Sequence, residues 1–287
     1  MGKTGVIGGS ALYSIEGLKV TEKRTVDTPF GPPSDEFVVG ELAGSKVVFL
    51  PRHGKGHTIL PSELNYRANI WAFKSLGVDR IISLSAVGSM KEELRPLDVV
   101  LVDQFIDRTN QARPSTFFGG GIVAHIPFAE PICHELKDTI LRANKDVGAR
   151  IHDGGTYLNM EGPAFSTRAE SLLYRKWGVD VIGMTNMPEA RLAREAGICY
   201  ATVAMVTDYD CWHEVDSGDS VTVEMVIENL NKNVEVAKKI LVNTLSAISV
   251  KRGCSCGDTL KNAIVTSREM IPESVKKELA PILEGLV

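Results

Sequence analysis

The chain alternates short apolar runs with longer stretches in which apolar residues recur every three or four positions. The short runs predict strands, and the longer stretches predict helices. The clearest strands are predicted at residues 4–7, 37–40, 46–50, 80–84, 99–102, 155–160, 179–184 and 198–206, and the clearest helices at residues 62–76, 129–147, 167–177, 222–250 and 272–286. Ser62 is the predicted N-cap of the first helix, Thr167 and Glu170 form a predicted capping box, and residues 85–89 form a predicted turn after the fourth strand. This alternation predicts an α/β fold with a central mixed, largely parallel sheet flanked by helices.

The predicted elements form one unit. No linker is polar enough to divide the chain, and the apolar fraction of 44% is ample for one large core. We therefore expect a single domain over residues 1–287, in which residues 254–287 form a C-terminal extension with a Cys-Ser-Cys pair and a helix.

Charge and hydropathy exclude several classes of protein. The net charge of −4 is mild, and no basic cluster is interleaved with aromatic residues, so nucleic acid is not an expected partner. No run approaches the roughly 20 apolar residues of a membrane span, and the first residues lack the layout of a signal peptide. The expected protein is cytoplasmic, with small-molecule partners and no membrane.

The strand predicted at residues 198–206 leads directly into Thr207, Asp208, Tyr209 and Asp210. If the chain stays extended, the two carboxylates point the same way, at the sheet edge where α/β proteins bind ligands. Two close carboxylates repel, which favours a proton on one of them at neutral pH. A solvated acidic loop is the alternative interpretation of the same residues.

Other chemically capable residues follow predicted strands in the same way. Arg52 and His53, followed by His57, combine a forked cation with titratable donors beside glycines, a composition that suits an oxyanion. The remaining candidates are Ser10, Ser85 with the Ala86 backbone, Thr185, Phe165 and Met184. Hydroxyls and cations predict an anion site, Phe165 and Met184 an apolar wall, and Asp208 with Asp210 acceptors or a proton source.

In their order along the chain, these residues resemble the family of trimeric purine nucleoside phosphorylases and 5′-methylthioadenosine phosphorylases. The resemblance runs from residue 5 to about 250. The motifs that carry it are Gly8-Gly9-Ser10, Asp27-Thr28-Pro29-Phe30-Gly31, Arg52-His53-Gly54 with His57, residues 65–71, residues 103–109, Glu161-Gly162-Pro163 with Phe165, and residues 207–212.

The resemblance implies a role for each matching position. Phosphate is held by Ser10, Arg52, His53, Ser85, Ala86 and Thr185; the ribose meets Met184; the 5′ substituent meets His57 and a His125 lent by a neighbouring subunit; and the base meets Phe165, Thr207, Asp208 and Asp210. Val223 and Ile227 are candidates for contact with a methylthio group, although ordinary helix packing explains them equally well. The implied assembly is a homotrimer or homohexamer.

The implied reaction is phosphorolysis of the N-glycosidic bond of 5′-methylthioadenosine, with inversion at the anomeric carbon, and adenosine is a second candidate substrate. It needs no metal or organic cofactor, because phosphate is a co-substrate. A carboxylic acid at purine N7 helps the base leave, and Asp208 is the favoured residue. Relatives that prefer 6-oxopurines carry Glu and Asn where this chain has Ser166 and Asp208, which favours adenine here.

Three other functions are compatible with a purine site. They are a nucleosidase that uses water, a catalytically silent nucleoside-binding protein, and a phosphorylase that prefers inosine or guanosine. Arg52 and His53 argue against the nucleosidase, which has no need of a phosphate cluster.

The five cysteines allow more than one interpretation. Cys254-Ser255-Cys256 without a second pair is weak evidence for a zinc site, and cytosolic thiols are usually reduced. A weaker resemblance to the archaeal, thermophilic branch of the family implies disulfides instead. The hypothesis is that Cys254–Cys256 and Cys133–Cys199 are disulfides in a thermophilic protein.

Overall fold

The computed structural model describes residues 2–9, 15–110, 112–213 and 223–286, without the side chains of Val223 and Met225. Its strands are β1 (Lys3–Gly8), β2 (Lys19–Arg24), β3 (Phe37–Leu42), β4 (Ser45–Pro51), β5 (Val78–Ser89), β6 (Val99–Leu101), β7 (Gln104–Arg108), β8 (Ile151–Asp153), β9 (Thr156–Met160), β10 (Val181–Gly183) and β11 (Cys199–Asp208). Its helices are α1 (Tyr66–Ser75), α2 (His134–Ala143), α3 (Arg168–Lys176), α4 (Asn186–Glu195), η2 (Asp210–Trp212), α5 (Val223–Ala247), η3 (Cys256–Asp258), η4 (Arg268–Met270), α6 (Glu273–Glu278) and α7 (Ala280–Leu283).

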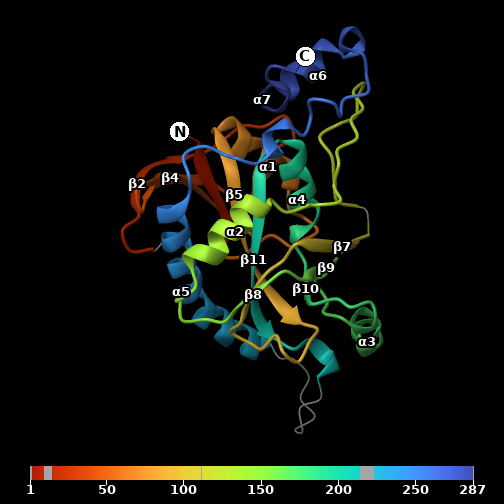
Figure 1. The fold of residues 1–287 in the computed structure, drawn as a ribbon. Helices are drawn as coiled ribbons and strands as arrows, with labels where there is room; N and C mark the ends of the chain where they lie inside the picture. Colours follow the sequence, from red (N-terminus) through yellow and green to blue (C-terminus); the bar gives the residue numbers. More distant parts are fainter. Residues whose placement is uncertain (1, 10–14, 111, 214–222, 287) are drawn as a thin grey trace.

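All of these strands belong to one mixed sheet, as predicted (Figure 1). Its main path is β2-β3-β4-β1-β5-β10-β9-β7, while β11 pairs with β5 and β6, and β6 pairs with β8. Six of the ten pairings are parallel and four are antiparallel. Two of the four antiparallel pairings form the β2-β3-β4 meander, and the other two join β10 to β5 and β11 to β6.

The long strand β5 is the centre of the sheet. Its first half pairs with β1, its last residues pair with β10, and β11 runs along its other edge. The predicted strand ended at residue 84, but β5 continues to Ser89 because Ser85 to Gly88 keep pairing with β11. Ser85 and Ala86 therefore lie inside a strand, and the prediction that they form a turn is wrong.

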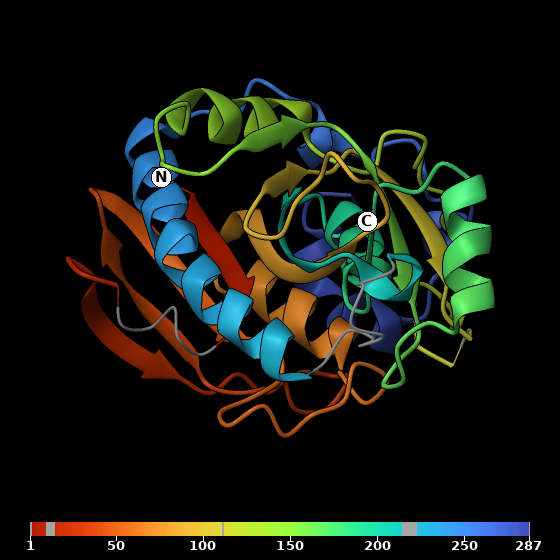
Figure 2. The same ribbon diagram turned by 90° about the horizontal axis from the view of Figure 1, so that it is seen from below.

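Helices cover both faces of the sheet. α2 and α5 pack together and contact β11, whereas α1 and α4 pack together and contact β5. Figure 2 shows α5 and α2 along one side of the molecule, with α3 at the opposite end. The core between these layers is formed by fully buried aliphatic and aromatic residues such as Ile7, Phe49, Phe73, Ile82 and Val203.

The start of α3 was predicted correctly from neighbouring residues, whereas the start of α1 was not. Thr167 and Glu170 form the predicted capping box at the start of α3. Ser62, the predicted cap of the first helix, is not its cap. Asn65 takes that role by accepting the N–H of Ala68 at 3.1 Å, and its own Nδ2 donates to the carbonyl of Phe30. α1 consequently begins four residues later than predicted.

The C-terminal segment after α5 packs beside α1 and the 107–128 loop (Figure 1). The predicted last helix is divided into α6 and α7, with η4 just before it, and α7 contacts α1. Trp71 Nε1 donates to the carbonyl of Glu278 at 2.9 Å, and Leu279, Ile282 and Leu283 are buried. None of the described helices is long and apolar enough to cross a bilayer.

Candidate active site

The end of β11 holds Asp208 and Asp210 in two different environments. Asp208 accepts the hydroxyl of Thr207 at 2.7 Å on Oδ2 and the backbone N–H of Asp210 at 2.8 Å on Oδ1. Asp210 is buried, and its Oδ2 accepts the hydroxyl of Ser171 from α3 at 2.6 Å. Asp208 is the more exposed of the two carboxylates, and Asp210 is anchored to a helix.

The premise that this stretch stays extended is wrong. Tyr209 leaves the strand, and Asp210 has φ of +54°, from which η2 begins. The turn lets the N–H of Asp210 bond to the Asp208 carboxylate, so the residues remain neighbours without pointing along the same direction. Burial raises the pKa of both groups, and the charge of Asp208 raises the pKa of Asp210 further.

Arg52, directly after β4, forms a buried ion pair with Glu189 of α4. Nε donates to Oε2 at 2.8 Å and Nη2 to Oε1 at 3.0 Å, while Nη1 donates to the Leu84 carbonyl and Nη2 to the Ser83 hydroxyl. Burial lowers the pKa of Arg52, but Glu189 more than offsets this and keeps the guanidinium charged. Among the described residues, these bonds use four of its five N–H groups.

Hydroxyl groups gather next to this ion pair. The Tyr157 hydroxyl lies 3.2 Å from Ser85 Oγ, and it also hydrogen-bonds Thr185. Burial raises the pKa of Tyr157, so the phenol keeps its proton. Tyr157 thus connects Ser85 and Thr185 by hydrogen bonds. Ser85 directly follows Leu84, whose carbonyl accepts from Arg52. Ala86, the next residue of β5, is exposed.

His53 and His57 stack on each other, with ring centroids 4.3 Å apart. His53 Nδ1 lies 2.8 Å from the carbonyl of Ile59, and a carbonyl only accepts, so Nδ1 carries a proton. Burial lowers the pKa of His53 to about 4. The neutral ring therefore leaves Nε2 as an acceptor, able to take a hydrogen bond from a hydrogen phosphate. His57 is exposed and has φ of +57°.

The predicted apolar wall is only partly packed. Met184 follows β10 and lies against Gly162, where a Cβ atom would come within 2.5 Å of Met184 Sδ. Phe165, in the loop between β9 and α3, is 52% exposed. An exposed phenyl ring in this loop is free to cover a flat ligand.

The remaining predicted residues are Ser10, His125, Val223 and Ile227. Ser10 and the side chain of Val223 lie outside the described residues. Ile227 is 51% exposed on the first turns of α5. His125 is exposed in the long loop and its backbone N–H donates to the carbonyl of Ala263 at 2.8 Å, in the C-terminal segment.

The fold and these residues can be compared with known proteins. The model of one protein family, described as the phosphorylase superfamily, matches residues 3–246. The chain belongs to the phosphorylase superfamily.

Individual members of the superfamily resemble the chain over nearly its whole length. An S-methyl-5′-thioadenosine phosphorylase from Geobacter sulfurreducens is 56% identical over 99% of this chain and 98% of its own. A crystal structure of a methylthioadenosine phosphorylase from an antarctic soil metagenomic library has a TM-score of 0.91 at 48% identity, covering 98% of this chain and 99% of its own. A variant of the Schistosoma mansoni adenosine/methylthioadenosine phosphorylase in complex with methylthioadenosine has a TM-score of 0.83 at 35% identity, with both chains fully covered.

Sequence reasoning missed the residues that hold this phosphorylase-superfamily site together. Glu189 was not singled out, although it pairs with Arg52 and also accepts the hydroxyls of Ser83 and Tyr200 at 2.8 Å each. A glutamate in the first turn of a helix normally interacts with the helix dipole, so its position gave no sign that it faces the sheet. Tyr157 and Ser171 were missed because each is one residue of an ordinary strand or helix pattern.

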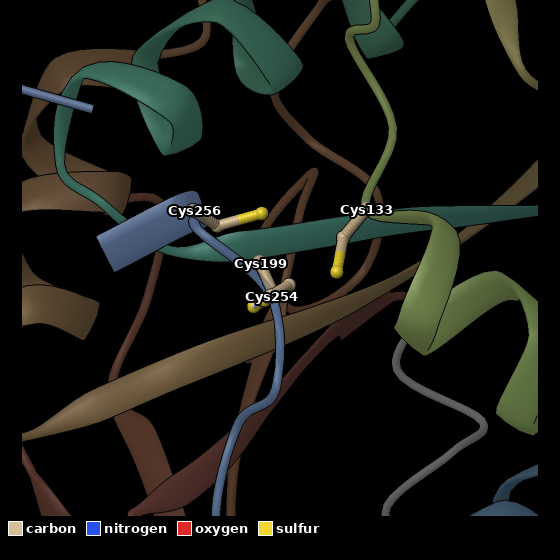
Figure 3. Close-up of side chains that lie close together, drawn as sticks. All are labelled: Cys133, Cys199, Cys254 and Cys256. Atoms are coloured by element: carbon tan, nitrogen blue, oxygen red, sulfur yellow. Dashed lines mark hydrogen bonds between the residues drawn. The ribbon is translucent and has the colours of Figure 1, made fainter. Parts of the chain in front are cut away.

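The disulfide prediction is wrong in the structure. All five cysteines are free, and neither Cys254–Cys256 nor Cys133–Cys199 forms a bond. The inference of a thermophilic protein loses its basis with them. Cys133, Cys199, Cys254 and Cys256 do converge, however (Figure 3), and within the described residues they are the one group of three or more side chains placed to hold a metal ion.

Proposed function

We propose that this protein cleaves the N-glycosidic bond of 5′-methylthioadenosine with phosphate, releasing adenine and 5-methylthio-α-ribose 1-phosphate. The observation that carries the proposal is that two unlike sets of groups lie along the last residues of the paired strands β5 and β11 and on the segments hydrogen-bonded to them. Ser85, Thr185 and Arg52 supply donors for an anion, and Asp208 with Asp210 supply carboxyl groups for a base. The names of the similar proteins, above all the Geobacter sulfurreducens phosphorylase, support the same substrate.

Phosphate is the nucleophile in this proposal. The hydroxyls of Ser85 and Thr185, with the Ala86 N–H and the neutral ring of His53, orient it beneath the anomeric carbon. Its negative charge stabilises the ribosyl cation that develops as the bond to the purine breaks. Ser10 is assigned to the same phosphate by its place in the family motif.

Asp208 is the proposed acid at purine N7. A purine leaves as a near-neutral group only when N7 is protonated or strongly hydrogen-bonded. Burial raises the pKa of Asp208, which favours the protonated form that this step requires. Asp210 is proposed to hydrogen-bond the 6-amino group, because its Oδ2 is already held by Ser171.

The remaining contacts are proposed from their positions. Phe165 covers the base, Met184 lies against the ribose, and His57, Val223 and Ile227 face the methylthio group. His125 is proposed to act at the site of a neighbouring subunit in a trimer or hexamer, since its loop is held by the C-terminal segment of its own chain. Thr207 supports Asp208 through its hydroxyl.

The experiment is a panel of methylthioadenosine, adenosine, inosine and guanosine, each incubated with and without phosphate. We expect adenine and a pentose 1-phosphate from methylthioadenosine only when phosphate is present. Equal cleavage without phosphate would indicate a nucleosidase, binding without turnover a silent binding protein, and faster cleavage of inosine a 6-oxopurine phosphorylase. Each of these results contradicts the proposal.

A further inference from the structure

Four cysteines from three separate parts of the chain meet beside the sheet. Cys133 precedes α2, Cys199 is the first residue of β11, and Cys254 and Cys256 lie in the C-terminal segment. Their Sγ atoms all lie within 4.8 Å of one another, and those of Cys199 and Cys254 are 3.3 Å apart. In Figure 3 the sulfur atoms of Cys133 and Cys256 turn toward the same space beside Cys199 and Cys254.

The spacing suits thiolates around one small ion. Zinc–sulfur bonds of about 2.3 Å in a tetrahedron place neighbouring sulfurs about 3.8 Å apart, whereas bonded sulfurs in a disulfide are about 2.05 Å apart. A multi-iron cluster sets several irons and sulfides between its cysteines and therefore needs a wider cage. Soft thiolates in a tetrahedral set of four select zinc among the common divalent ions.

We propose that Cys133, Cys199, Cys254 and Cys256 bind one Zn²⁺ ion in a closed structural site. Cys133, Cys199 and Cys256 are each at most 5% exposed, and four protein ligands leave no open coordination position. The site is therefore structural and takes no part in the chemistry at the end of β11.

An arginine offsets part of the charge of such a site, because four thiolates around Zn²⁺ carry a net charge of −2. Arg252 Nη1 lies 3.9 Å from Cys199 Sγ and is held by the carbonyls of Asp79 and Gly197 at 3.2 and 2.9 Å. A fixed cation beside the sulfur atoms is the kind of outer-shell group that supports thiolate ligands.

The backbone near the Cys-Ser-Cys pair packs tightly against Arg252 and the first turn of α2. A Cβ atom at Gly257 would lie 2.5 Å from Arg252 Nη2, so the guanidinium occupies the place of a side chain there. Gly253 donates its N–H to Glu135 Oε2 at 2.6 Å, which ties the same segment to the first turn of α2. The Cys-Ser-Cys pair is thus seated against α2 and β11 by contacts on both sides.

The ion would fix the C-terminal segment to the core. Seven to ten residues after Cys256, Ala263 accepts the N–H of His125, Ile264 pairs with Ala124, and the Thr266 hydroxyl accepts the N–H of Val123 at 2.8 Å. The site therefore supports the loop that carries His125. Any effect on turnover through His125 rests on the proposed function, whereas the metal site itself does not.

The test is the metal content of the full-length chain purified under reducing conditions, measured by mass spectrometry. We expect one zinc per chain, with four thiols protected from alkylation until a chelator is added, and Cys211 reactive throughout as an internal control. Cys254→Ser and Cys256→Ser should lose zinc, while the matched Cys211→Ser variant should retain it. Cobalt added to the chelated wild-type protein should give the intense visible absorption of a tetrahedral thiolate complex, and zinc should abolish it.

The wild-type measurements keep the test valid even where a cysteine variant fails to fold. Metal-free protein with four freely reactive thiols would overturn the proposal, as would bound iron in place of zinc or two disulfides in peptide mapping. Metal content and alkylation are measured without turnover. A failure of the metal site is therefore distinguishable from a failure of the proposed phosphorolysis.

Discussion

Arg52 and Glu189 face each other as a bidentate pair, with Nε–Oε2 and Nη2–Oε1 distances of 2.8 and 3.0 Å, and both side chains are at most 4% exposed. The pair joins the end of β4 to the first turn of α4. It fixes the direction in which the guanidinium presents its remaining N–H. Glu189, which was not among the predicted phosphate-binding residues, thus positions Arg52, which was.

Glu189→Gln should therefore affect both stability and phosphate binding. Removing one partner of a buried ion pair leaves an uncompensated charge and costs about 3–5 kcal/mol. We expect a loss of that order in urea unfolding and a higher KM for phosphate with a smaller change in the KM for the nucleoside. Glu273→Gln is the matched control, because Glu273 is exposed and forms a surface ion pair with Lys276. Equal stability of the two variants would contradict the role given to Glu189.

Asp208→Asn should reduce turnover of methylthioadenosine by about 100-fold or more, because an amide cannot give a proton to N7. It should also shift preference toward inosine, since N7 and the 6-oxo group lie on the same edge of the purine and the two N–H groups of an amide at this position can donate to both. Asp210→Asn is the comparison, and we expect it to destabilise the fold as well, because Ser171 loses a buried carboxylate acceptor. Steady-state kinetics on both nucleosides would decide, and an unchanged substrate preference in Asp208→Asn would refute the assignment.

The sequence predicted what depends on neighbours along the chain and failed where distant segments meet. The capping box of Thr167 and Glu170 was predicted because both partners lie within one turn. Asn65 was missed as the cap of α1 because its second bond goes to Phe30, 35 residues away. Glu189 was missed for the same reason, because its partner Arg52 is 137 residues distant.

The same difference between local and distant contacts explains which residues of the candidate site were singled out from the sequence. The sequence singled out Arg52, Ser85, Thr185 and Asp208 as candidates because polar residues next to apolar runs are visible in any single sequence. The groups that orient them, such as Tyr157, belong to strands and helices whose pattern is explained by packing alone. The four cysteines lie up to 123 positions apart, and only the fold shows that they converge.

Glu195 predicts how stability changes with pH. Burial raises the pKa of this carboxyl to about 7, while it accepts the Thr116 hydroxyl and the Phe117 N–H at 2.7 Å each. The unfolded chain releases the proton near its ordinary pKa of about 4.5, so the native state binds more protons between these values. Stability from this group is full below about pH 4.5 and is lost as pH rises to about 7, by up to about 3 kcal/mol.

Glu195→Gln tests this directly, since the amide can accept from Phe117 and donate to the Thr116 oxygen. The variant should lose the fall in stability over that range and become more stable than wild type above pH 7. Urea unfolding at half-unit pH steps measures the difference between the two curves. His53 acts with the opposite sign, because its pKa is lowered to about 4 and its contribution rises with pH, but it is present in both proteins and cancels. A difference curve that is flat with pH would contradict the raised pKa.

His125 gives a prediction about assembly. If His125 completes the site of a neighbouring subunit, an Asp208→Asn chain still lends an intact His125 to its neighbour, and a His125→Ala chain still has an intact Asp208. Each variant alone should be a poor enzyme. Co-expressed in equal amounts, they should form mixed oligomers in which about one quarter of the sites combine an intact Asp208 with an intact His125 from the next chain. We expect methylthioadenosine turnover to recover to about that fraction of wild type. Simple mixing of the separately purified variants without subunit exchange is the control and should recover none. Activity of the mixed oligomers no higher than the mean of the two variants would place His125 outside the neighbouring site.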